Sequence, residues 1–367
     1  MADPGIVAGE AHAAVPPPPA GRGGTVSQGR EAVTLRAVAA RAGVSKSLVS
    51  RVLQGSPHVS EERRQAVEAA IRELGYRPNA TARSLSQRRT HAVGVLMHDL
   101  RQPWFVDFLE GLDRTLHANG LHPLVGDARV DRASNERLLQ AFMEMRVDGL
   151  VLAGTLPPSA TVAEAAAWLP TVVAGNRDVE LPRVDVVAQD DWSGARLALD
   201  HLASLGHRRI GHVAGSGGKV FDLRRASYEA WMREHGLEDR VAVAGCDTTE
   251  EGGYQAARRL LDRRRGRPTA LFVANDLPCL GVMAAARELG LQVPDDLAIV
   301  GFDNSVLARM RFVALTSVDI APGRAGELAG TALVERIADP ARPARHQLLT
   351  PTLEVRRSSG PPRRRPA

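Results

Sequence analysis

Polar side chains recur at positions i, i+3, i+4 and i+7 in the segment 45–54, where they would share one face of a short helix. The positions are Ser47, Ser50, Arg51 and Gln54, and Lys46 lies beside them at the start of the helix. Arg and Gln side chains pair with base edges in the major groove of DNA, whereas Ser hydroxyls and the backbone amides at a helix start bind phosphates. This face therefore predicts contacts to double-stranded DNA. The alternative is a three-helix packing module with a solvated polar face.

A second group of polar residues follows predicted strands further along the chain. Asn275 and Asp303 come directly after the apolar runs ALFVA and AIVGF, and Arg224 begins a predicted helix after a Gly-rich loop. Open α/β sheets bind their ligands at the carboxyl ends of the strands. Guanidinium and carboxylate groups suit the hydroxyl array of a sugar or polyol. These residues therefore predict a ligand-binding cleft.

Other residues near these positions have two interpretations each. Trp104 and Phe105 could form an apolar wall for a ligand, although aromatic residues at a helix start more often belong to the core. Arg177 is a weaker candidate contact. The aspartates of the segment 190–194, DDWSG, are as compatible with helix capping as with ligand binding.

Patterns for catalysis, nucleotide binding and metal binding fail on inspection. The stretch GSGGK at 215–219 lacks the spacing of a phosphate-binding loop and has no Ser or Thr after its lysine. His207 and His212 have no neighbouring cysteine or carboxylate pair, so a zinc site is not expected. The sequence contains no Gly-x-Ser-x-Gly elbow and no paired catalytic carboxylates. The sequence therefore predicts neither an enzyme nor a resident cofactor.

Three short helices are predicted to position the DNA-contacting face. Thr34 can cap the first helix, which Gly43 ends because glycine adopts the left-handed conformation freely. Ser45 can cap the second helix and Ser60 the third. The first two helices and their turn form a helix-turn-helix, and residues 33–78 form its domain. Residues 31–90 carry a net charge of +6 while the rest of the chain sums to −1, which also favours a polyanion partner.

The later part of the chain alternates apolar strands with amphipathic helices, a pattern typical of doubly wound parallel α/β sheets. Strands are expected at 92–97, 121–126, 149–153, 171–174, 184–187, 209–214, 241–244, 270–274 and 297–302. Helices are expected at 104–119, 193–205, 223–235, 252–265 and 279–289. The length of this part exceeds that of one ordinary sheet, so residues 91–357 are predicted to form two lobes.

Composition limits the remaining possibilities. The chain of 367 residues is 44% hydrophobic, has two cysteines and contains no apolar stretch long enough to span a membrane. Membrane proteins, disulfide scaffolds and structural zinc modules are therefore excluded, and a soluble cytoplasmic protein is expected. Residues 1–32, rich in Pro and Gly, and residues 358–367 are predicted to be disordered tails.

An ordered series of motifs resembles the LacI/GalR (lactose-repressor) family of bacterial transcription regulators. It begins with TLRAVAARAGVSKSLVSRVL and HVSEERRQAVEAAIRELGYRPNATARSL, and continues with VGVLMHDLRQPWF, DGLVLAG, HLASLGHRRIGHVAG, RPTALFVAND, LGLQVPDDLAIVGFDN and ALTSVD. The resemblance covers residues 34–357. It implies a helix-turn-helix headpiece, a hinge helix and linker over residues 79–90, and a two-lobed body like the periplasmic binding proteins. It also implies a homodimer that binds a pseudo-palindromic operator.

The resemblance also implies roles for individual residues. Leu85 matches the leucine that wedges into the minor groove, and Ala82 would let two hinge helices approach closely. The full set of expected DNA contacts is Thr34, Ser45, Lys46, Ser47, Ser50, Arg51, Gln54, His58, Asn79, Ala82 and Leu85. The expected effector contacts are Arg224, Asn275, Asp303, Trp104, Phe105 and Arg177. Dimer contacts are expected from Cys279, Leu280 and Met283. Ser227 stands where the family usually has Gly, which is a departure close to the cleft.

The sequence therefore predicts a ligand-responsive, DNA-binding transcriptional regulator whose operator affinity a small molecule, such as a sugar or sugar derivative, modulates. Three alternatives remain at this stage: a solute-binding protein for transport, an enzyme on the same scaffold, and an activator of the same family. A solute-binding protein would need a signal peptide and would lack residues 34–86, and an enzyme would need catalytic groups that the sequence does not show. A nucleobase effector, or none, remains an alternative to the sugar.

Overall fold

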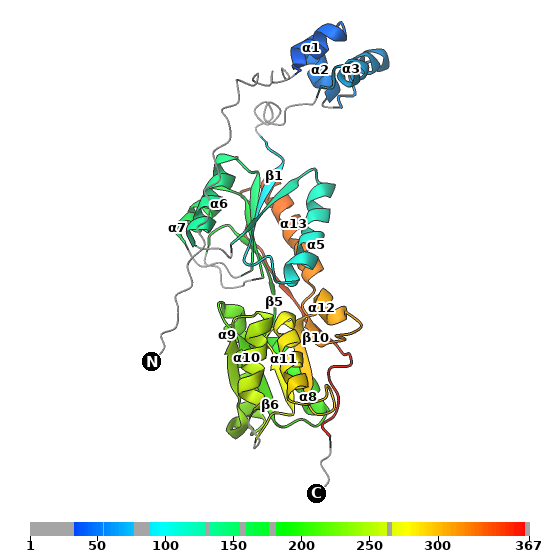
Figure 1. The fold of residues 1–367 in the computed structure, drawn as a ribbon. Coiled ribbons are helices and arrows are strands. Elements are labelled where there is room, and N and C mark those ends of the chain that lie inside the picture. The colour runs from blue at the N-terminus through cyan, green and yellow to red at the C-terminus, as the bar shows by residue number, and fades with distance from the viewer. Residues whose placement is uncertain are drawn as a thin grey trace, which may run out of the picture. The chain divides into compact units, whose positions relative to one another are not determined.

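The computed structural model describes residues 33–53, 55–76, 89–128, 132–154, 159–175, 181–262 and 266–363, shown in colour in Figure 1. The chain divides into two compact units, residues 1–79 and 80–367. Several predictions concern positions outside the described residues: the tail 1–32, the hinge helix with Asn79, Ala82 and Leu85, and the contacts Gln54 and Arg177.

The first unit consists of helices α1 (Leu35–Arg41), α2 (Lys46–Leu53) and α3 (Glu61–Leu74) around a small apolar core. The predicted caps of the first two helices are confirmed, because the Thr34 hydroxyl accepts from the Ala37 amide and the Ser45 hydroxyl from the Leu48 amide, each at 3.2 Å. Gly43 has a φ of +65° at the predicted stop. Ser60 precedes α3 but makes no side-chain capping bond, so its expected contribution is absent.

The second unit contains two six-stranded sheets, one in each lobe (Figure 1). In the first lobe the strand order is β11-β5-β4-β3-β1-β2, and every pairing is parallel. These strands are β1 (Ala92–Met97), β2 (His122–Asp127), β3 (Gly149–Ala153), β4 (Thr171–Ala174), β5 (Asp185–Gln189) and β11 (His346–Leu349). In the second lobe the order is β12-β10-β9-β8-β6-β7. In this described sheet β10 pairs with β12 in antiparallel fashion, and the other four pairings are parallel. These strands are β6 (Ile210–Gly215), β7 (Val243–Cys246), β8 (Ala270–Val273), β9 (Ala298–Asp303), β10 (Thr316–Asp319) and β12 (Thr352–Glu354).

Helices cover both faces of each sheet, as expected for a doubly wound fold. The first lobe carries α5 (Trp104–Ala118), α6 (Arg132–Glu144), α7 (Ala160–Trp168) and α13 (Pro322–Ala338). The second carries α8 (Asp191–Ser204), α9 (Lys219–Glu234), α10 (Glu250–Leu261), α11 (Asp276–Glu288) and the short α12 (Val306–Arg309). The helices α10 and α11 lie against each other so closely that a Cβ atom on Gly281 would overlap the carbonyl oxygen of Glu250. Glycine is therefore required at this crossing.

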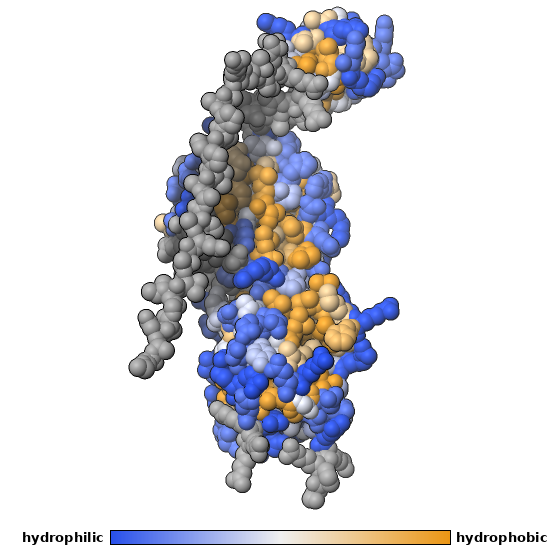
Figure 2. Space-filling view, in the orientation of Figure 1, coloured by the Kyte–Doolittle hydropathy of each residue, from blue (hydrophilic) through white to orange (hydrophobic). Residues whose placement is uncertain are grey.

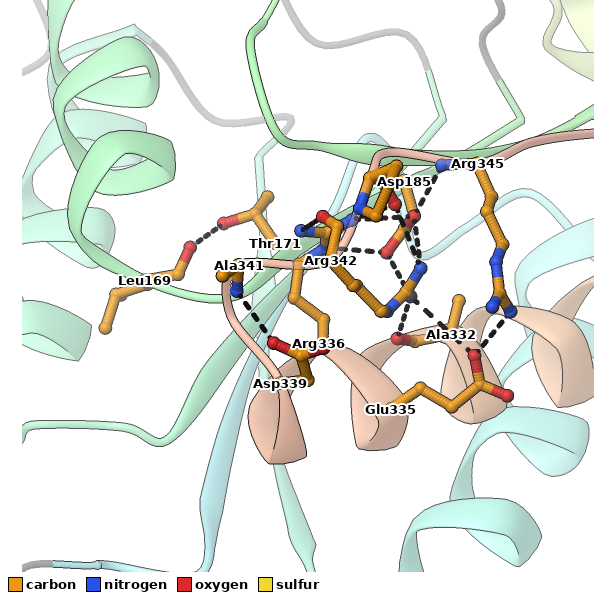
Figure 3. A network of polar contacts seen from close by, with 11 residues as sticks. Leu169, Thr171, Asp185, Ala332, Glu335, Arg336, Asp339, Ala341, Arg342 and Arg345 are labelled. Carbon is orange, nitrogen blue, oxygen red and sulfur yellow. Dashed lines mark hydrogen bonds and ion pairs between the residues drawn. The ribbon is translucent and has the colours of Figure 1, made fainter.

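The chain crosses between the lobes three times: from β5 to α8, from β10 to α13, and from β11 to β12. A buried ion cluster fixes the last return into the first lobe (Figure 3). The carboxylate of Asp185 on β5 accepts from Arg336 at 2.7 and 3.0 Å and from Arg342 at 2.6 and 3.2 Å. It also accepts from the backbone amide of Arg345 at 2.8 Å, directly before β11. The cluster thereby joins α13 and β11 to β5.

The nine predicted strands are all confirmed within a few residues of their bounds, as are the five predicted helices of the two-lobed unit. The pattern did not identify α6, α7, α13, β10, β11 or β12. One tail prediction is wrong in its first part, because residues 358–363 are described and packed against the second lobe. Ser358 is buried, and its hydroxyl accepts from the Thr316 amide at 2.7 Å and donates to the Ile299 carbonyl at 2.7 Å. Residues 364–367 lie outside the described residues.

None of the helices described is both long enough and apolar enough to cross a membrane.

Candidate nucleic-acid interface and interlobe cleft

The polar face predicted on α2 is present and accessible in the structure. Lys46, Ser47 and Arg51 are exposed and Ser50 is half-buried, while Val49 and Val52 on the opposite face lie in the core. Neither Lys46 nor Arg51 forms an ion pair with another described residue. Both cations are therefore available to an external anion.

Two arginines on the neighbouring helices make contacts within this unit. Arg41 on α1 contacts Glu73 on α3 at 2.6 Å, and Arg64 donates to the Ser56 carbonyl at 2.9 Å. Among the described residues Arg36 on α1 and Arg63 on α3 are likewise exposed and form no ion pair, so α2 contributes two of the four such cations of this unit. Three further predicted contacts, Thr34, Ser45 and His58, are exposed; the first two also serve as the helix caps described above.

A cleft lies between the two lobes at the carboxyl ends of their parallel strands, where ligands of such sheets bind. Counting its open mouth, it contains about 670 Å3 of empty space. Its lining includes Gly154, Gly175 and Gln189 after β3, β4 and within β5, and Asn275 and Asp303 at the ends of β8 and β9. The other lining residues are His98, Asp99, Gln102, Trp104, Phe105, Val220, Phe221, Arg224, Thr248 and Ile320. The structure thus brings together five of the six predicted effector contacts; Arg177, the sixth, is not described.

Arg224 is buried at the base of this cleft, where each of its three guanidinium nitrogens has a partner. Its guanidinium donates to Asp191 at 2.9 Å and to the backbone carbonyl of Ala274, and lies 3.7 Å from the centroid of the Phe302 ring. The third nitrogen, Nη2, lies 2.8 Å from Asp191 and 3.9 Å from Asp303. The positive charge is therefore neutralised mainly by Asp191, which the sequence pattern had placed in a capping motif. Asp190 is the residue that caps α8, through the Ser193 amide at 3.2 Å.

Asp303 presents its carboxyl group at an unusual backbone position, with a φ of +107°, followed by Asn304 with a φ of +49°. Burial raises the pKa of Asp303 well above its usual value, Arg224 opposes this, and the nearby carboxylates of Asp276 and Asp191 add to the rise. Burial also raises the pKa of Asp276 to about 6, against the hydrogen bonds from Ser317 and Ser305. Strained conformations of this kind persist where the surrounding structure determines them, often at ligand sites.

Three polar atoms on the cleft lining are buried and have no hydrogen-bond partner among the described residues. They are the indole nitrogen of Trp104, the side-chain nitrogen of Gln189 and the side-chain oxygen of Asn275. Buried polar atoms without partners are uncommon and costly. Two donors and one acceptor therefore remain for a bound ligand.

Trp104 and Phe105 lie in the core and also on the cleft lining, so the structure is compatible with both interpretations of these residues. Each side chain is buried, and the Trp104 ring stacks on Phe108 with centroids 4.9 Å apart, so both belong to the core of the first lobe. Both also line the cleft. Sequence reasoning missed Gln102, Gln189, Phe221 and Thr248, because nothing in their local pattern distinguishes them from ordinary loop and strand residues.

The predicted dimer contacts need one correction. Cys279 is completely buried in the core of its own lobe, because it lies on the side of α11 that faces β9. Its thiol donates to the Asn275 carbonyl at 3.4 Å. It therefore cannot contact a partner, whereas Leu280 and Met283 are half-buried. Large apolar side chains are instead exposed around α12, where Figure 2 shows an apolar patch. The exposed fractions are 41% for Val306, 47% for Met310 and 96% for Phe312.

Comparison with known proteins follows the same division of the chain. Residues 34–79 match the model of the bacterial regulatory proteins of the lacI family, and residues 199–359 match the periplasmic binding protein-like domain. The ribose operon repressor of Escherichia coli strain K12 is 35% identical over 331 residues, which cover 89% of this chain and 99% of the relative.

Two solved structures are similar over nearly the same length. A complex of the transcriptional regulator CelR with cellobiose is 32% identical, with a TM-score of 0.66 and coverage of 89% of this chain and 99% of that chain. The lac repressor dimer bound to operator and the anti-inducer ONPF is 27% identical, with a TM-score of 0.79 and coverage of 90% of this chain and 100% of that chain.

Proposed function

The chain belongs to the lacI family of bacterial regulatory proteins and is a ligand-responsive DNA-binding repressor, and from this premise we propose which residues carry each activity. Residues 33–78 form the DNA-binding domain, residues 79–90 the hinge helix and linker, and residues 91–357 the effector-binding and dimerisation body. The protein acts in the cytoplasm of a bacterium.

The recognition helix α2 reads the operator. Arg51 and Gln54 contact base edges, while Lys46, Ser47 and Ser50 contact the phosphate backbone and fix the register. Thr34, Ser45, His58 and the hinge residues Asn79, Ala82 and Leu85 complete the DNA contacts, as the resemblance implies. The absence of an ion pair at Lys46 and Arg51 among the described residues supports this assignment, because both cations are exposed on the same helix as Ser47 and Ser50.

The protein binds its operator as a homodimer, which requires a pseudo-palindromic site. The exposed apolar residues Val306, Met310 and Phe312 supply the partner surface in the second lobe, together with Leu280 and Met283. A contiguous exposed apolar patch is typical of an association surface. The lac repressor, which is similar over 90% of this chain, was solved as a dimer on its operator.

The effector is a small, uncharged molecule with several hydroxyl groups, such as a sugar or sugar derivative. The observation that carries this proposal is the set of buried, unpartnered donors and acceptor around Trp104, Gln189 and Asn275. A hydroxyl group both donates and accepts and so can satisfy all three. An anionic effector is disfavoured because Arg224 already has Asp191 as its counter-ion, and Asp303 lies beside it. The similar regulator CelR was solved with cellobiose.

A thermal-shift screen of the full chain against sugars, sugar phosphates, polyols and nucleobases tests the effector class. A ligand that binds only the folded state raises the melting temperature according to its concentration relative to Kd. We expect a neutral sugar or polyol to stabilise the protein and Arg224→Met to abolish that shift. The neighbouring Arg225→Met is the matched control, because Arg225 is exposed and its guanidinium pairs with Glu229 on the same helix, at 2.8 Å. Stabilisation by a phosphate ester alone, or an unchanged shift in Arg224→Met, would contradict this assignment.

A further inference from the structure

One side chain, Gln102, bridges the two lobes across the cleft with both ends of its amide. Its oxygen accepts from the Asn275 side-chain nitrogen at 2.9 Å. Its nitrogen donates to the Thr248 carbonyl at 3.2 Å and to the Thr248 hydroxyl at 3.3 Å. Gln102 belongs to the first lobe, whereas its two partners belong to the second, where they follow β8 and β7.

The backbone on both sides of this bridge is fixed. Gln102 lies in the turn before α5. Its backbone amide donates to the Asp99 backbone carbonyl at 3.0 Å, and its backbone carbonyl accepts from the Phe105 backbone amide at 3.1 Å. Thr248 has a φ of +64° and directly precedes Thr249, whose hydroxyl caps α10 by accepting from the Gly252 amide at 3.0 Å. The carbonyl of Thr248 is thus held in place by the structure around it.

A carbonyl oxygen can only accept a hydrogen bond, and this fact sets the direction of the whole chain of contacts. Because the Thr248 carbonyl needs a donor, the nitrogen of Gln102 faces it and the oxygen of Gln102 faces Asn275. Because that oxygen also needs a donor, the nitrogen of Asn275 faces Gln102. The oxygen of Asn275 is then left without a partner among the described residues, and Asn275 lines the cleft.

We propose that Gln102 is a positioning residue that orients the Asn275 amide with its oxygen toward the ligand, so that the cleft selects a ligand with an O–H or N–H donor at this point. The inference rests on the proposed effector site and adds a requirement to it. An analogue that presents only an acceptor at this point leaves the buried oxygen unsatisfied. Such mismatches against a buried polar group discriminate strongly between ligands.

The orientation can be tested on the ligand-free full chain, labelled with 15N and 2H. The Asn275 side-chain amide resonance is identified by its absence from the Asn275→Leu variant, and its hydrogen exchange rate is then compared among variants at position 102. We expect exchange to be about tenfold faster in Gln102→Met, which removes the acceptor. Gln102→Glu should restore slow exchange, because a carboxylate still accepts from Asn275. A merely structural role of Gln102 would not separate these two variants.

Thr248→Val provides the matched control for a change of side chain next to Gln102. It removes the hydroxyl but keeps the carbonyl, so the Asn275 amide should exchange as slowly as in the unaltered chain. In the opposite orientation the Gln102 oxygen would face Thr248, whose hydroxyl is the only side-chain donor there. The Gln102 nitrogen would then face the Asn275 oxygen, so the Asn275 side-chain amide would already exchange fast in the unaltered chain, and Gln102→Met would not accelerate it. Either result overturns the proposal, and neither depends on whether the effector is a sugar.

Discussion

Replacing Asp185 by Asn should lower the free energy of unfolding of the first lobe strongly, although the two side chains have nearly the same shape. The carboxylate is 1% exposed and accepts hydrogen bonds from Arg336, Arg342 and the Arg345 backbone. The guanidinium side chains of Arg336 and Arg342 are themselves only 2% and 8% exposed. The substitution therefore removes the nearest carboxylate from two buried positive charges; the next one, on the half-exposed Glu335, lies 4.0 Å from Arg342.

The magnitude follows from this burial. Removing one partner of a buried ion pair costs about 3–5 kcal/mol, because the remaining charge is desolvated and uncompensated. For a lobe of this size that corresponds to a decrease in melting temperature of about 6–20 °C. Glu335→Gln is the matched control. Glu335 contacts Arg345 at 2.7 Å, where both side chains are about half exposed, and lies 4.0 Å from Arg342, so we expect a loss within about 1 kcal/mol.

Urea denaturation followed by circular dichroism, together with thermal melts, measures both variants against the unaltered chain. A loss of less than 1 kcal/mol for Asp185→Asn would refute the reasoning. It would mean that the cost of burying these three charges already cancels their mutual attraction.

The same cluster predicts a pH dependence. Burial by itself raises the pKa of Asp185, but the hydrogen bonds from Arg336 and the Arg345 backbone and the charges of Arg336 and Arg342 outweigh it, so the pKa lies below its usual value. A depressed carboxyl pKa stabilises the folded state above the unfolded pKa of about 3.9, and this contribution disappears as the pH falls through the lower folded pKa. The stability difference between Asp185→Asn and the unaltered chain should therefore shrink only below about pH 4.

Three further outcomes are expected. Gly281→Ala should cost at least about 1–3 kcal/mol in urea denaturation, because its Cβ overlaps the Glu250 carbonyl oxygen, whereas Gly245→Ala, with open space around its Cβ, should be neutral. Phe312→Asp should weaken dimerisation at least about tenfold in sedimentation equilibrium while the melting temperature of the dissociated chain stays unchanged, because this side chain is 96% exposed. Arg51→Ala should remove the preference for operator over scrambled duplex in a binding titration but keep weak, salt-sensitive binding; preserved discrimination would contradict a base-reading role.

The parts of the fold that could be predicted from sequence are those with a strong local signal. The run Ala92–Met97 is continuously apolar and forms the interior strand β1, and Gly43 marks the turn between α1 and α2. The strands β11 and β12 could not be predicted, because they are short edge strands of four and three residues with partly exposed side chains. Their place depends on distant partners such as Asp185, which no local window contains.

The site divides in the same way. Arg224, Asn275 and Asp303 could be predicted because each stands at the end of a strand or the start of a helix in a recognisable motif. Gln102 and Thr248 could not, since their roles arise only when the two lobes face each other across 146 residues of sequence. Cys279 was assigned to a surface by its position in a motif, but the register of α11 turns its thiol into the core.

Because the chain crosses between the lobes three times, the sheet of the first lobe stays incomplete during most of synthesis. Synthesis proceeds from the N-terminus, so strands β1 to β5 emerge long before α13 and β11, which complete their sheet. Until residue 349 has been made, β5 is an open edge, and unpaired edges are sites of aggregation. Asp185 stands at the start of that edge as a carboxylate without its arginines, and a charge on an edge strand opposes pairing with another chain. Asp185, whose ion pairs join β11 and α13 to β5 in the folded chain, thus also opposes aggregation at the edge of β5 while the rest of the repressor is being translated.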